Sequence, residues 1–255
     1  MTVPLRMILA PNASPMTLDG TRTYIVGRTE AVVIDPGPDL PAHLDRLADA
    51  VSGARKVTVV LTHYHEDHAS GAAALGRMLR APVRGSIGPG RLSEGDVVSS
   101  DAGDLHVLET PGHAREHLAF HWPDAQAIFC GDLMMGGLDT ALVATPEGSL
   151  TAYLASLDRL RSLSARVIYP THGPEFTDPD RAIAKYLAHR AERERQVLAA
   201  LADGAADLET IAARIYGAVD PALRGWVEAT TRAYLEHLER IGRIDGAWRQ
   251  SLARP

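Results

Sequence analysis

The stretch Thr62-His63-Tyr64-His65-Glu66-Asp67-His68 places three histidines and one aspartate within six residues. It directly follows the apolar run 57–61, whose β-branched residues are typical of a strand. Imidazole nitrogens and carboxylate oxygens form a ligand set that suits Zn²⁺ and that iron or manganese also accept. His63 and His65 are two residues apart, so at an extended strand end they point the same way. The stretch therefore predicts a metal site rather than a solvated polar loop.

Similar polar clusters follow other predicted strands of the chain. Strands that end on polar, glycine-rich turns can bring distant residues to one edge of a sheet. The clusters are IDPG at 34–37 with Asp35, TPGH at 110–113 with His113, CGD at 130–132 with Asp132, and PTHG at 170–173 with His172. The apolar patterns predict strands at 23–26, 31–34, 57–61, 105–108, 127–130 and 167–169, and helices at 40–51, 69–80 and 150–163.

The segment HYHEDH at 63–68 resembles the HxHxDH motif of the metallo-β-lactamase superfamily, and the other clusters follow in that family's order between about residues 20 and 175. The resemblance implies an α/β fold, the αββα sandwich, with a dinuclear metal site at one sheet edge. It also implies a ligand for each position. His63, His65 and His113 would hold the first metal, Asp67, His68 and His172 the second, and Asp132 would bridge the two.

A dinuclear site of this kind has a well-defined chemistry. Two divalent cations about 3.5–4 Å apart share a hydroxide and lower its pKa to about 7. The hydroxide attacks an electrophilic carbonyl or phosphorus, and the cations stabilise the developing oxyanion. Asp132 bridges the cations in this scheme, and Asp67 can orient the nucleophile. The sequence therefore predicts a metal-dependent hydrolase with two divalent ions, Zn²⁺ being expected first and iron or manganese also being compatible.

Several residues near the motifs are expected to support the site or the core. Asp35 is expected to brace the metal loop by hydrogen bonds, and His117, four residues after His113, to act as a supporting group. Cys130, the single cysteine, is expected in the core. Met134 and Met135 fit a pocket wall and core packing equally well. The five histidines outside the motifs are expected to be ordinary ones: His43, His106, His121, His189 and His237.

Charge divides the chain near the loop 171–180. Residues 1–180 carry 22 acids against 14 bases, whereas residues 181–255 carry 10 acids against 12 bases. The first part is predicted to be the catalytic domain. The second part, with amphipathic helices at 192–201, 207–216 and 221–241 and a hairpin turn at Asp245-Gly246, resembles a winged-helix domain. This combination resembles the β-lactamase-like protein 2 family, some of whose members are endoribonucleases.

The substrate stays open at this level, because the superfamily resemblance fixes the metal chemistry alone. RNA or another phosphodiester is one candidate. A glyoxalase II-like acylglutathione thioester, another ester or a lactone is a second, although the GCGRFFEG-like run of glyoxalase II is absent. A non-hydrolytic di-iron redox or sensor protein is the alternative from another class. The C-terminal part is too weakly basic for a dedicated nucleic-acid binder and is better explained as a lid or packing domain.

The remaining expectations concern where the protein works and with what. The chain has no apolar run of the roughly 18 residues that a membrane span needs, and its first residues lack a long apolar stretch typical of a secretory signal. We therefore expect a cytoplasmic protein with no membrane partner. A small ester, a thioester or RNA is its expected partner, and a homodimer is compatible with the C-terminal helices.

Overall fold

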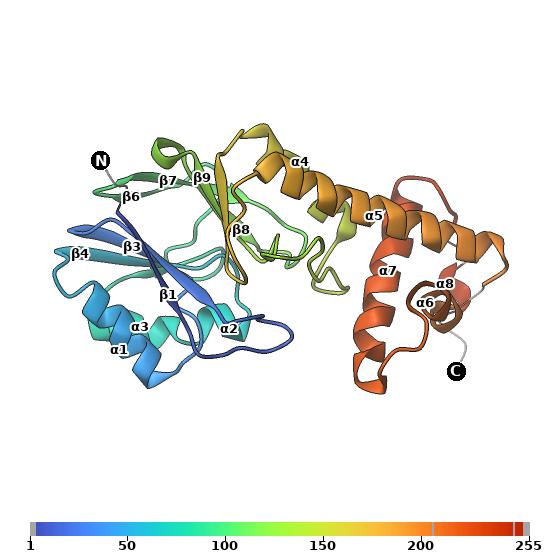
Figure 1. The fold of residues 1–255 in the computed structure, drawn as a ribbon, viewed down its shortest axis with the longest axis horizontal. Helices are drawn as coiled ribbons and strands as arrows, with labels where there is room; N and C mark the ends of the chain where they lie inside the picture. Colours follow the sequence, from blue (N-terminus) through green and yellow to red (C-terminus); the bar gives the residue numbers. More distant parts are fainter. Residues whose placement is uncertain (1–3, 206, 247, 252–255) are drawn as a thin grey trace.

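Two β-sheets packed face to face form the centre of the molecule in the computed structural model, which describes residues 4–205, 207–246 and 248–251 (Figure 1). Helices cover the outer face of each sheet. The first sheet contains β1 Leu5–Leu9, β2 Arg22–Val26, β3 Glu30–Ile34, β4 Lys56–Val60 and β5 Val83–Arg84, and the second contains β6 Val97–Ser100, β7 Gly103–Glu109, β8 Leu118–Trp122, β9 Ala127–Gly131 and β10 Val167–Pro170. The predicted αββα sandwich is thus confirmed.

Strand order places the carboxyl ends of distant strands at one edge. The first sheet has the order β1-β2-β3-β4-β5, with β3 and β4 parallel, and the second has the order β10-β9-β8-β7-β6, with β9 and β10 parallel. Parallel neighbours end on the same side, so the turns after β3 and β4, and those after β9 and β10, meet there. Tyr24 joins the two sheets, since its hydroxyl donates a hydrogen bond of 2.7 Å to the Pro170 carbonyl.

Side-chain alternation along the strands separates the core into layers. In β2, Tyr24 and Val26 point into the space between the sheets and pack with Phe120 and Phe129 of the second sheet. The intervening Ile25 points outward, under the helices of the first sheet. Both faces of the central strands are therefore buried, which explains their almost continuous apolar sequences.

The helices form the two outer layers and the C-terminal region. α1 and α3 pack on the first sheet, whereas α4 and the long α5 pack on the second. The hydrophobic cluster under α4 continues without a break into α6 and α7. The helices are α1 Pro41–Ala50, α2 Glu66–Ala69, α3 Ala72–Leu79, α4 Leu150–Ser162, α5 Pro179–Ala202, α6 Leu208–Tyr216, α7 Arg224–Arg240 and α8 Trp248–Ser251, with 3-10 turns η1 Pro123–Ala125 and η2 Pro221–Leu223.

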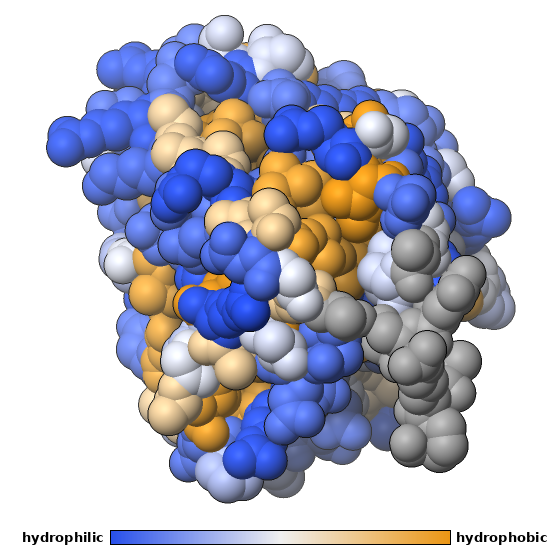
Figure 2. Space-filling model, turned by 90° about the vertical axis from the view of Figure 1, so that its right-hand side faces the viewer, coloured by the Kyte–Doolittle hydropathy of each residue, from blue (hydrophilic) through white to orange (hydrophobic). Residues whose placement is uncertain are grey.

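The C-terminal region differs from the prediction in one element. The expected hairpin around Asp245-Gly246 is wrong for the described residues, because the short helix α8 begins at Trp248, while residue 247 lies outside the described part. Trp248 donates its indole N–H to Glu239 of α7 at 3.0 Å, which ties this segment to the helix. Figure 2 looks onto this end of the molecule and shows an apolar area bordered by polar side chains.

Element bounds differ from the prediction in two other places. The helix expected from residue 69 begins at Glu66 and is interrupted at Gly71, so Asp67 and His68 lie within α2. The helix expected at 192–201 is the end of the much longer α5. The predicted boundary near residue 180 falls in the first turn of that helix, and the division into two domains stays a prediction. None of the helices in the described ranges has the length and apolarity needed to cross a membrane.

Candidate metal centre

Four turns that follow strands bring the predicted ligands together at one edge of the sandwich. The turn after β4 carries the stretch 62–68, and the turns after β7, β9 and β10 carry His113, Asp132 and His172. We call the following seven side chains the histidine–aspartate cluster: His63, His65, Asp67, His68, His113, Asp132 and His172. Within it, three groups of three residues have ligand atoms that all lie within 4.8 Å of one another.

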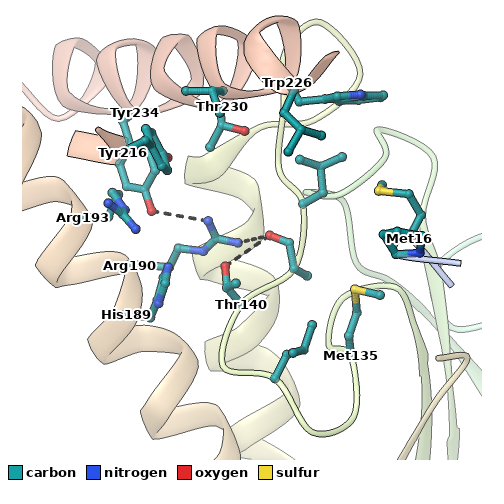
Figure 3. A pocket seen from close by; sticks show the side chains of 16 residues that line it. Met16, Met135, Thr140, His189, Arg190, Arg193, Tyr216, Trp226, Thr230 and Tyr234 are labelled. Carbon is teal, nitrogen blue, oxygen red and sulfur yellow. Dashed lines mark hydrogen bonds between the residues drawn. The ribbon is translucent and has the colours of Figure 1, made fainter. Parts of the chain in front are cut away.

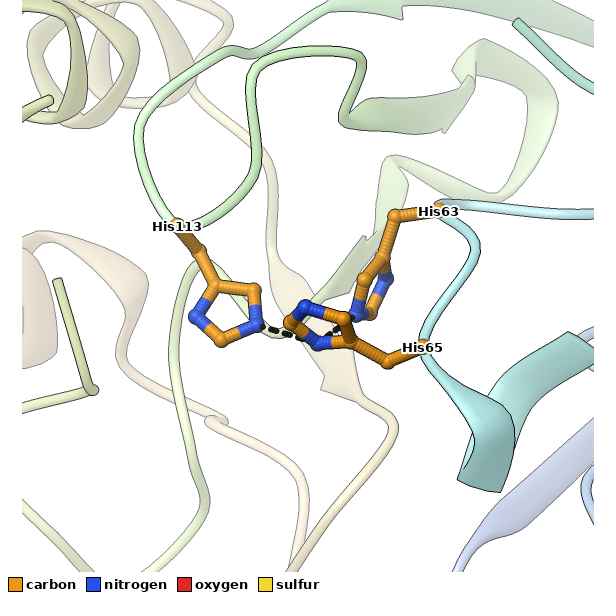
Figure 4. Close-up of side chains that lie close together, drawn as sticks. All are labelled: His63, His65 and His113. Atoms are coloured by element: carbon orange, nitrogen blue, oxygen red, sulfur yellow. Dashed lines mark hydrogen bonds between the residues drawn. The ribbon is translucent and has the colours of Figure 1, made fainter. Parts of the chain in front are cut away.

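The first group consists of three imidazoles that approach one another from two turns (Figure 4). Nδ1 of His65 lies 3.0 Å from Nε2 of His63 and 3.0 Å from Nε2 of His113. His63 is fully buried, whereas the side chain of His65 is partly exposed. Three nitrogens facing one point from different chain segments are the arrangement of a metal site with imidazole ligands.

Asp132 lies between this group and the second one. Its Oδ2 is 3.7 Å from Nε2 of His113, while its Oδ1 is 3.3 Å from Nε2 of His68 and 3.5 Å from Nε2 of His172. Asp67 completes the second group, since its Oδ2 lies 3.1 Å from Nε2 of His172. The two oxygens of Asp132 therefore face different sets of imidazoles, as a bridging carboxylate would.

Three atoms at the middle of the cluster are buried and form no hydrogen bond: Nε2 of His68, Oδ1 of Asp132 and Nε2 of His172. Their separations of 3.3 and 3.5 Å place them close together without hydrogen-bond geometry. Buried polar atoms nearly always have a partner, so an unpartnered set that converges on one point requires an explanation. A divalent cation would supply that partner, and the donor set of imidazole and carboxylate fits one.

The second nitrogen of each imidazole in the cluster has a partner of its own. Nδ1 of His68 donates to Asp35 at 2.9 Å, Nδ1 of His113 donates to the Leu142 carbonyl at 2.7 Å, and Nδ1 of His172 donates to the Gly20 carbonyl at 3.1 Å. Nδ1 of His63 lies 3.0 Å from the Thr62 hydroxyl, and Nε2 of His65 lies 3.2 Å from Glu147. Such contacts fix the tautomer and the orientation of a ligating histidine.

Asp35 holds the turn after β4 in place from the turn after β3. It is fully buried and accepts hydrogen bonds from the Thr62 amide at 2.8 Å and from the Thr62 hydroxyl at 2.7 Å. The hydroxyl of Thr171, next to His172, donates to the same carboxylate at 3.1 Å. Because its oxygens are used in this way, Asp35 positions two ligand-bearing turns and does not itself face the cluster's centre.

His117 supports Asp132 in a similar manner. Its Nε2 accepts a hydrogen bond of 3.2 Å from the Asp132 amide, which leaves the proton on Nδ1, where Thr110 lies at 2.9 Å. Gly131 is required beside it, because a Cβ at this position would lie 2.6 Å from Nε2 of His117 and the backbone has a φ of +52°. Burial lowers the pKa of His117 to about 3, so the ring is neutral.

At His68 and Asp132 the neighbouring charges oppose and exceed the effect of burial, whereas burial prevails at His63 and His113. Burial disfavours the charged form of His68, yet the carboxylates of Asp132 and Asp35 raise its pKa well above the ordinary value. Burial also disfavours ionised Asp132, yet His68 and His172 hold its pKa well below the ordinary value. Burial lowers the pKa of His63. The site thus stabilises an ionised carboxylate in a buried place, which is a property of a cation-binding centre.

The other residues singled out in the sequence take ordinary positions or form part of a neighbouring pocket. Cys130 is fully buried in the core, and burial raises the pKa of its thiol. Met134 is buried in the core, whereas Met135 lines a pocket. Among the remaining histidines, His43 is buried beside the turn after β3, with Nε2 3.0 Å from the Pro36 carbonyl.

Apart from Asp35 and His117, the sequence analysis did not single out the residues that hold the ligands in place. Thr62, Thr110 and Thr171 all lie within three residues before a cluster histidine, are buried, and contact Asp35 or a histidine of the site. Their recurrence at the strand ends is a signal that the sequence contains. Glu147 comes from a loop 82 residues beyond His65, and no motif marks it.

The two facing sheets and the histidine–aspartate cluster define a class of proteins with a metal site at one edge of an αββα sandwich. Residues 16–102 and 78–172 match the metallo-beta-lactamase superfamily, and the chain belongs to that family. It is similar over 93% of its length to the structure of a metallo-beta-lactamase family protein from Thermus thermophilus, which is covered to 94%, with a TM-score of 0.72 and 22% identity. That likeness concerns the fold.

Two curated relatives extend the comparison to the level of sequence identity. The chain is 34% identical over 205 residues to an atrochrysone carboxyl ACP thioesterase of Aspergillus chevalieri, with 76% of this chain and 64% of that protein covered. It is 28% identical over 210 residues to a beta-lactamase-like protein 2 homolog of Caenorhabditis elegans, with 76% and 70% covered. The match therefore spans less than two thirds of the fungal thioesterase.

Proposed function

We propose that this chain is a hydrolase that depends on two divalent metal ions, expected to be zinc, and cleaves an acyl thioester. The observation that carries the metal site is the convergence of His68, Asp132 and His172 on one buried point through atoms that have no hydrogen bond. The relative from Aspergillus chevalieri supports the thioester, because that protein is named an atrochrysone carboxyl ACP thioesterase.

The residues of the cluster divide into two metal positions and one shared ligand. His63, His65 and His113 would hold one ion, Asp67, His68 and His172 the other, and Asp132 both. Two bound cations would supply Lewis-acid polarisation of the carbonyl and a water of lowered pKa. Imidazoles whose far nitrogens are already held need no rearrangement to act as ligands.

Asp67 is the carboxylate best placed to orient the attacking water. It lies in the first turn of α2 and lines the pocket that contains His65 and His113, and its side chain is partly exposed there. Asp132 is buried and serves as the shared ligand. In the reaction, water adds to the carbonyl carbon, the carbon–sulfur bond breaks, and the thiol leaves with a proton while the acid is released.

The character of the pocket favours a thioester over a polyanion. Met16, Leu142, Ala144 and Trp226 form apolar parts of the wall around the cluster. The acidic side chains there include Glu66 and Glu147, and among the residues that the structure describes no lysine or arginine lines this pocket. A polyanion gains its affinity from cationic contacts with its phosphates, which this wall lacks.

RNA stays a second candidate because of a separate polar groove. Arg115, Arg232 and Arg240 line a groove of about 880 Å³ on the other side of the loop 144–149, which separates it from the cluster. Glu228 and Glu236 lie in the same groove and offset part of the positive charge. A phosphodiester held by the arginines is the arrangement that would make the chain a nuclease.

The test combines metal analysis with parallel assays of the purified protein. Zinc, iron and manganese are measured per chain, and hydrolysis is followed on an octanoyl N-acetylcysteamine thioester, an acylglutathione, a lactone and a single-stranded RNA. We expect two zinc ions per chain and turnover of the octanoyl thioester. Turnover should be lost in Asp132→Ala and kept in Asp104→Ala. Asp104 is a suitable control because it is an exposed aspartate on β7, outside the cluster.

Other results would replace the proposal in defined ways. Cleavage of RNA without turnover of any thioester would make the chain a nuclease. Hydrolysis of the acylglutathione or the lactone alone would move the substrate to those classes. Two redox-active irons per chain and no hydrolysis would establish the non-hydrolytic alternative.

A further inference from the structure

A second pocket adjoins the cluster and has a different character. It has a volume of about 370 Å³ and lies between the loop 135–142 and helices α5, α6 and α7 (Figure 3). Met16, Leu142 and Trp226 line both this pocket and the one that contains the cluster, so the two adjoin at these side chains. We call it the apolar pocket. Sites for small molecules usually measure roughly 300–1,000 Å³, so its size suits a ligand larger than an acetyl group.

Large apolar side chains are exposed around this pocket. Trp226, Met16 and Leu223 are 51%, 53% and 51% exposed, and Leu138 is 43% exposed. Single exposed apolar residues are ordinary on a protein surface. Four of them around one cavity beside a reaction site form a continuous apolar surface, which marks a place where an apolar ligand is bound. Tyr216 and Tyr234 add aromatic surface.

The pocket also has a cationic side without an acidic counterpart. Arg190 and Arg193 line it from α5, and its lining within the described ranges contains no aspartate or glutamate. Arg190 is 4% exposed, donates to the Ala141 carbonyl, lies 3.4 Å from the Tyr234 hydroxyl, and has a buried Nε without a partner. Figure 3 shows its guanidinium between α7 and the loop.

The hydrogen-bond partners of Arg193 in the described part of the chain are neutral, while the carboxylate of Glu192, which pairs with Arg195, is near enough to interact with it electrostatically. Nη1 of Arg193 donates to Gln196 at 2.8 Å and to the Ile215 carbonyl at 3.2 Å, and its guanidinium stacks on Tyr216 at 4.4 Å. The carboxylate of Asp139 lies nearby but contacts His189, at 3.5 Å. Two guanidinium groups against apolar and aromatic walls complement a ligand that is apolar and also carries an anionic oxygen.

We infer that the apolar pocket binds the acyl portion of the substrate and selects apolar or aromatic acyl groups that bear an anionic oxygen far from the thioester. The inference rests on the proposed thioesterase function and specifies its substrate. With the carbonyl at the cluster, the acyl group extends past Trp226 toward Arg193. Arg190 is buried and already holds Ala141, so Arg193 is the residue assigned to the anionic oxygen.

Binding is tested first, without catalysis. The probe is 2-naphthalenesulfonate, an aromatic anion that coordinates metals weakly, and its affinity for the metal-loaded protein is measured by calorimetry beside the neutral 2-naphthyl methyl sulfone. We expect Arg193→Met to weaken sulfonate binding about tenfold and to leave the sulfone unchanged, since a charge-assisted contact is lost. Arg193→Lys should restore part of the affinity. Trp226→Ala should weaken the binding of both the sulfonate and the sulfone.

The matched control is Arg195→Met, which removes an exposed arginine two residues further along the same helix, where it pairs with Glu192. It should change neither affinity. Sulfonate binding that is equal in the wild type and Arg193→Met, or in the wild type and Trp226→Ala, would overturn the assignment of the pocket.

Selection is tested with two N-acetylcysteamine thioesters of equal chain length, the octanoyl ester and the suberyl monoester with its terminal carboxylate. We expect a higher kcat/KM for the carboxylate-bearing ester and loss of that preference in Arg193→Met. Equal kcat/KM values in the wild type would refute the selection of an anionic oxygen. If the sulfonate binds as expected and no thioester is hydrolysed, the pocket stands and the proposed function fails. If the wild type and Trp226→Ala hydrolyse the thioester equally well, the proposed function stands and the assignment of the pocket fails.

Discussion

The histidine–aspartate cluster and the apolar pocket adjoin each other but are built in opposite ways. Each imidazole of the cluster is held at its second nitrogen, and Asp35 and His117 fix the turns around it. The apolar side chains of the pocket come mainly from α7 and from the loops that carry Met16 and residues 135–142, and several of them are exposed, whereas α5 contributes His189, Arg190 and Arg193. The contrast indicates that the chemistry requires a fixed geometry, whereas the choice of substrate rests on surfaces that tolerate substitution.

The largest expected effect distinguishes a shared ligand from one that serves a single group. Asp132→Ala should remove both metal ions, because its two oxygens face different groups, while His65→Ala should remove one, because His65 belongs to the first group. In each variant activity should fall by more than the ~100-fold that follows the loss of a supporting partner. Metal analysis and kcat measure this. Equal metal content in the two variants would argue against the bridging role.

The next effect concerns the support of the cluster. Asp35→Asn keeps the size of the side chain but weakens its contacts with Thr62 and His68. Metal affinity should fall about 10- to 100-fold, as for other partners of ligating histidines. Competition with a chelator measures the affinity, with Asp104→Asn as the control. A variant that binds metal as tightly as the wild type would show that the turn after β4 needs no brace.

A smaller effect is expected where the pocket loop is joined to α5. The Tyr186 hydroxyl accepts a hydrogen bond from the Met135 amide and donates one to the Met135 carbonyl, both at 2.8 Å. Tyr186→Phe leaves these buried groups without a partner and should lower the free energy of unfolding by ~1–3 kcal/mol. Urea denaturation measures it. The metal content of the variant should stay unchanged. A lower metal content would mean that the histidine–aspartate cluster and the apolar pocket are not independent.

The smallest effect lies farthest from the cluster, at the start of α6. Asp207 caps this helix by accepting a hydrogen bond of 2.7 Å from the Thr210 amide. Asp207→Ala should destabilise the protein by ~1 kcal/mol, and Asp207→Ser should recover most of that. Hydrogen exchange of the α6 amides reports the change. Altered metal affinity in Asp207→Ala would contradict the separation between the two regions.

The sequence predicted those parts of the fold and site that follow from local pattern. The apolar runs predicted β2, β3, β4 and β9 as strands, the spacing within 62–68 identified the stretch that contributes most of the cluster, and the family resemblance of the motifs implied the sandwich. β1, β5, β6 and β8 were missed. LRMIL and LAFHW contain few β-branched residues and form strands through pairing with neighbours, and β5 and β6 are only two and four residues long. The turn signal at Asp245-Gly246 was overridden by the contact between Trp248 and Glu239.

The apolar pocket could not be predicted, because its lining comes from loops and helices that are far apart in the sequence. Trp226 and Met16 meet only through the packing of α7 against the loops of the sandwich. Met135 illustrates the limit, since the pattern allowed a pocket wall and core packing equally, and tertiary structure assigned it to the pocket while Met134 entered the core. The local periodicity of a sequence does not indicate which distant segments pack against each other.

The continuity of α5 bears on how this molecule can move. The helix runs from Pro179 to Ala202 and contains neither glycine nor proline after its first residue, so it lacks the usual causes of a kink. A hinge between the sandwich and the C-terminal helices would have to bend it. The mouth of the pocket is therefore expected to open by rotamer changes of residues such as Trp226, on a timescale of nanoseconds, and not by the slower swing of a domain.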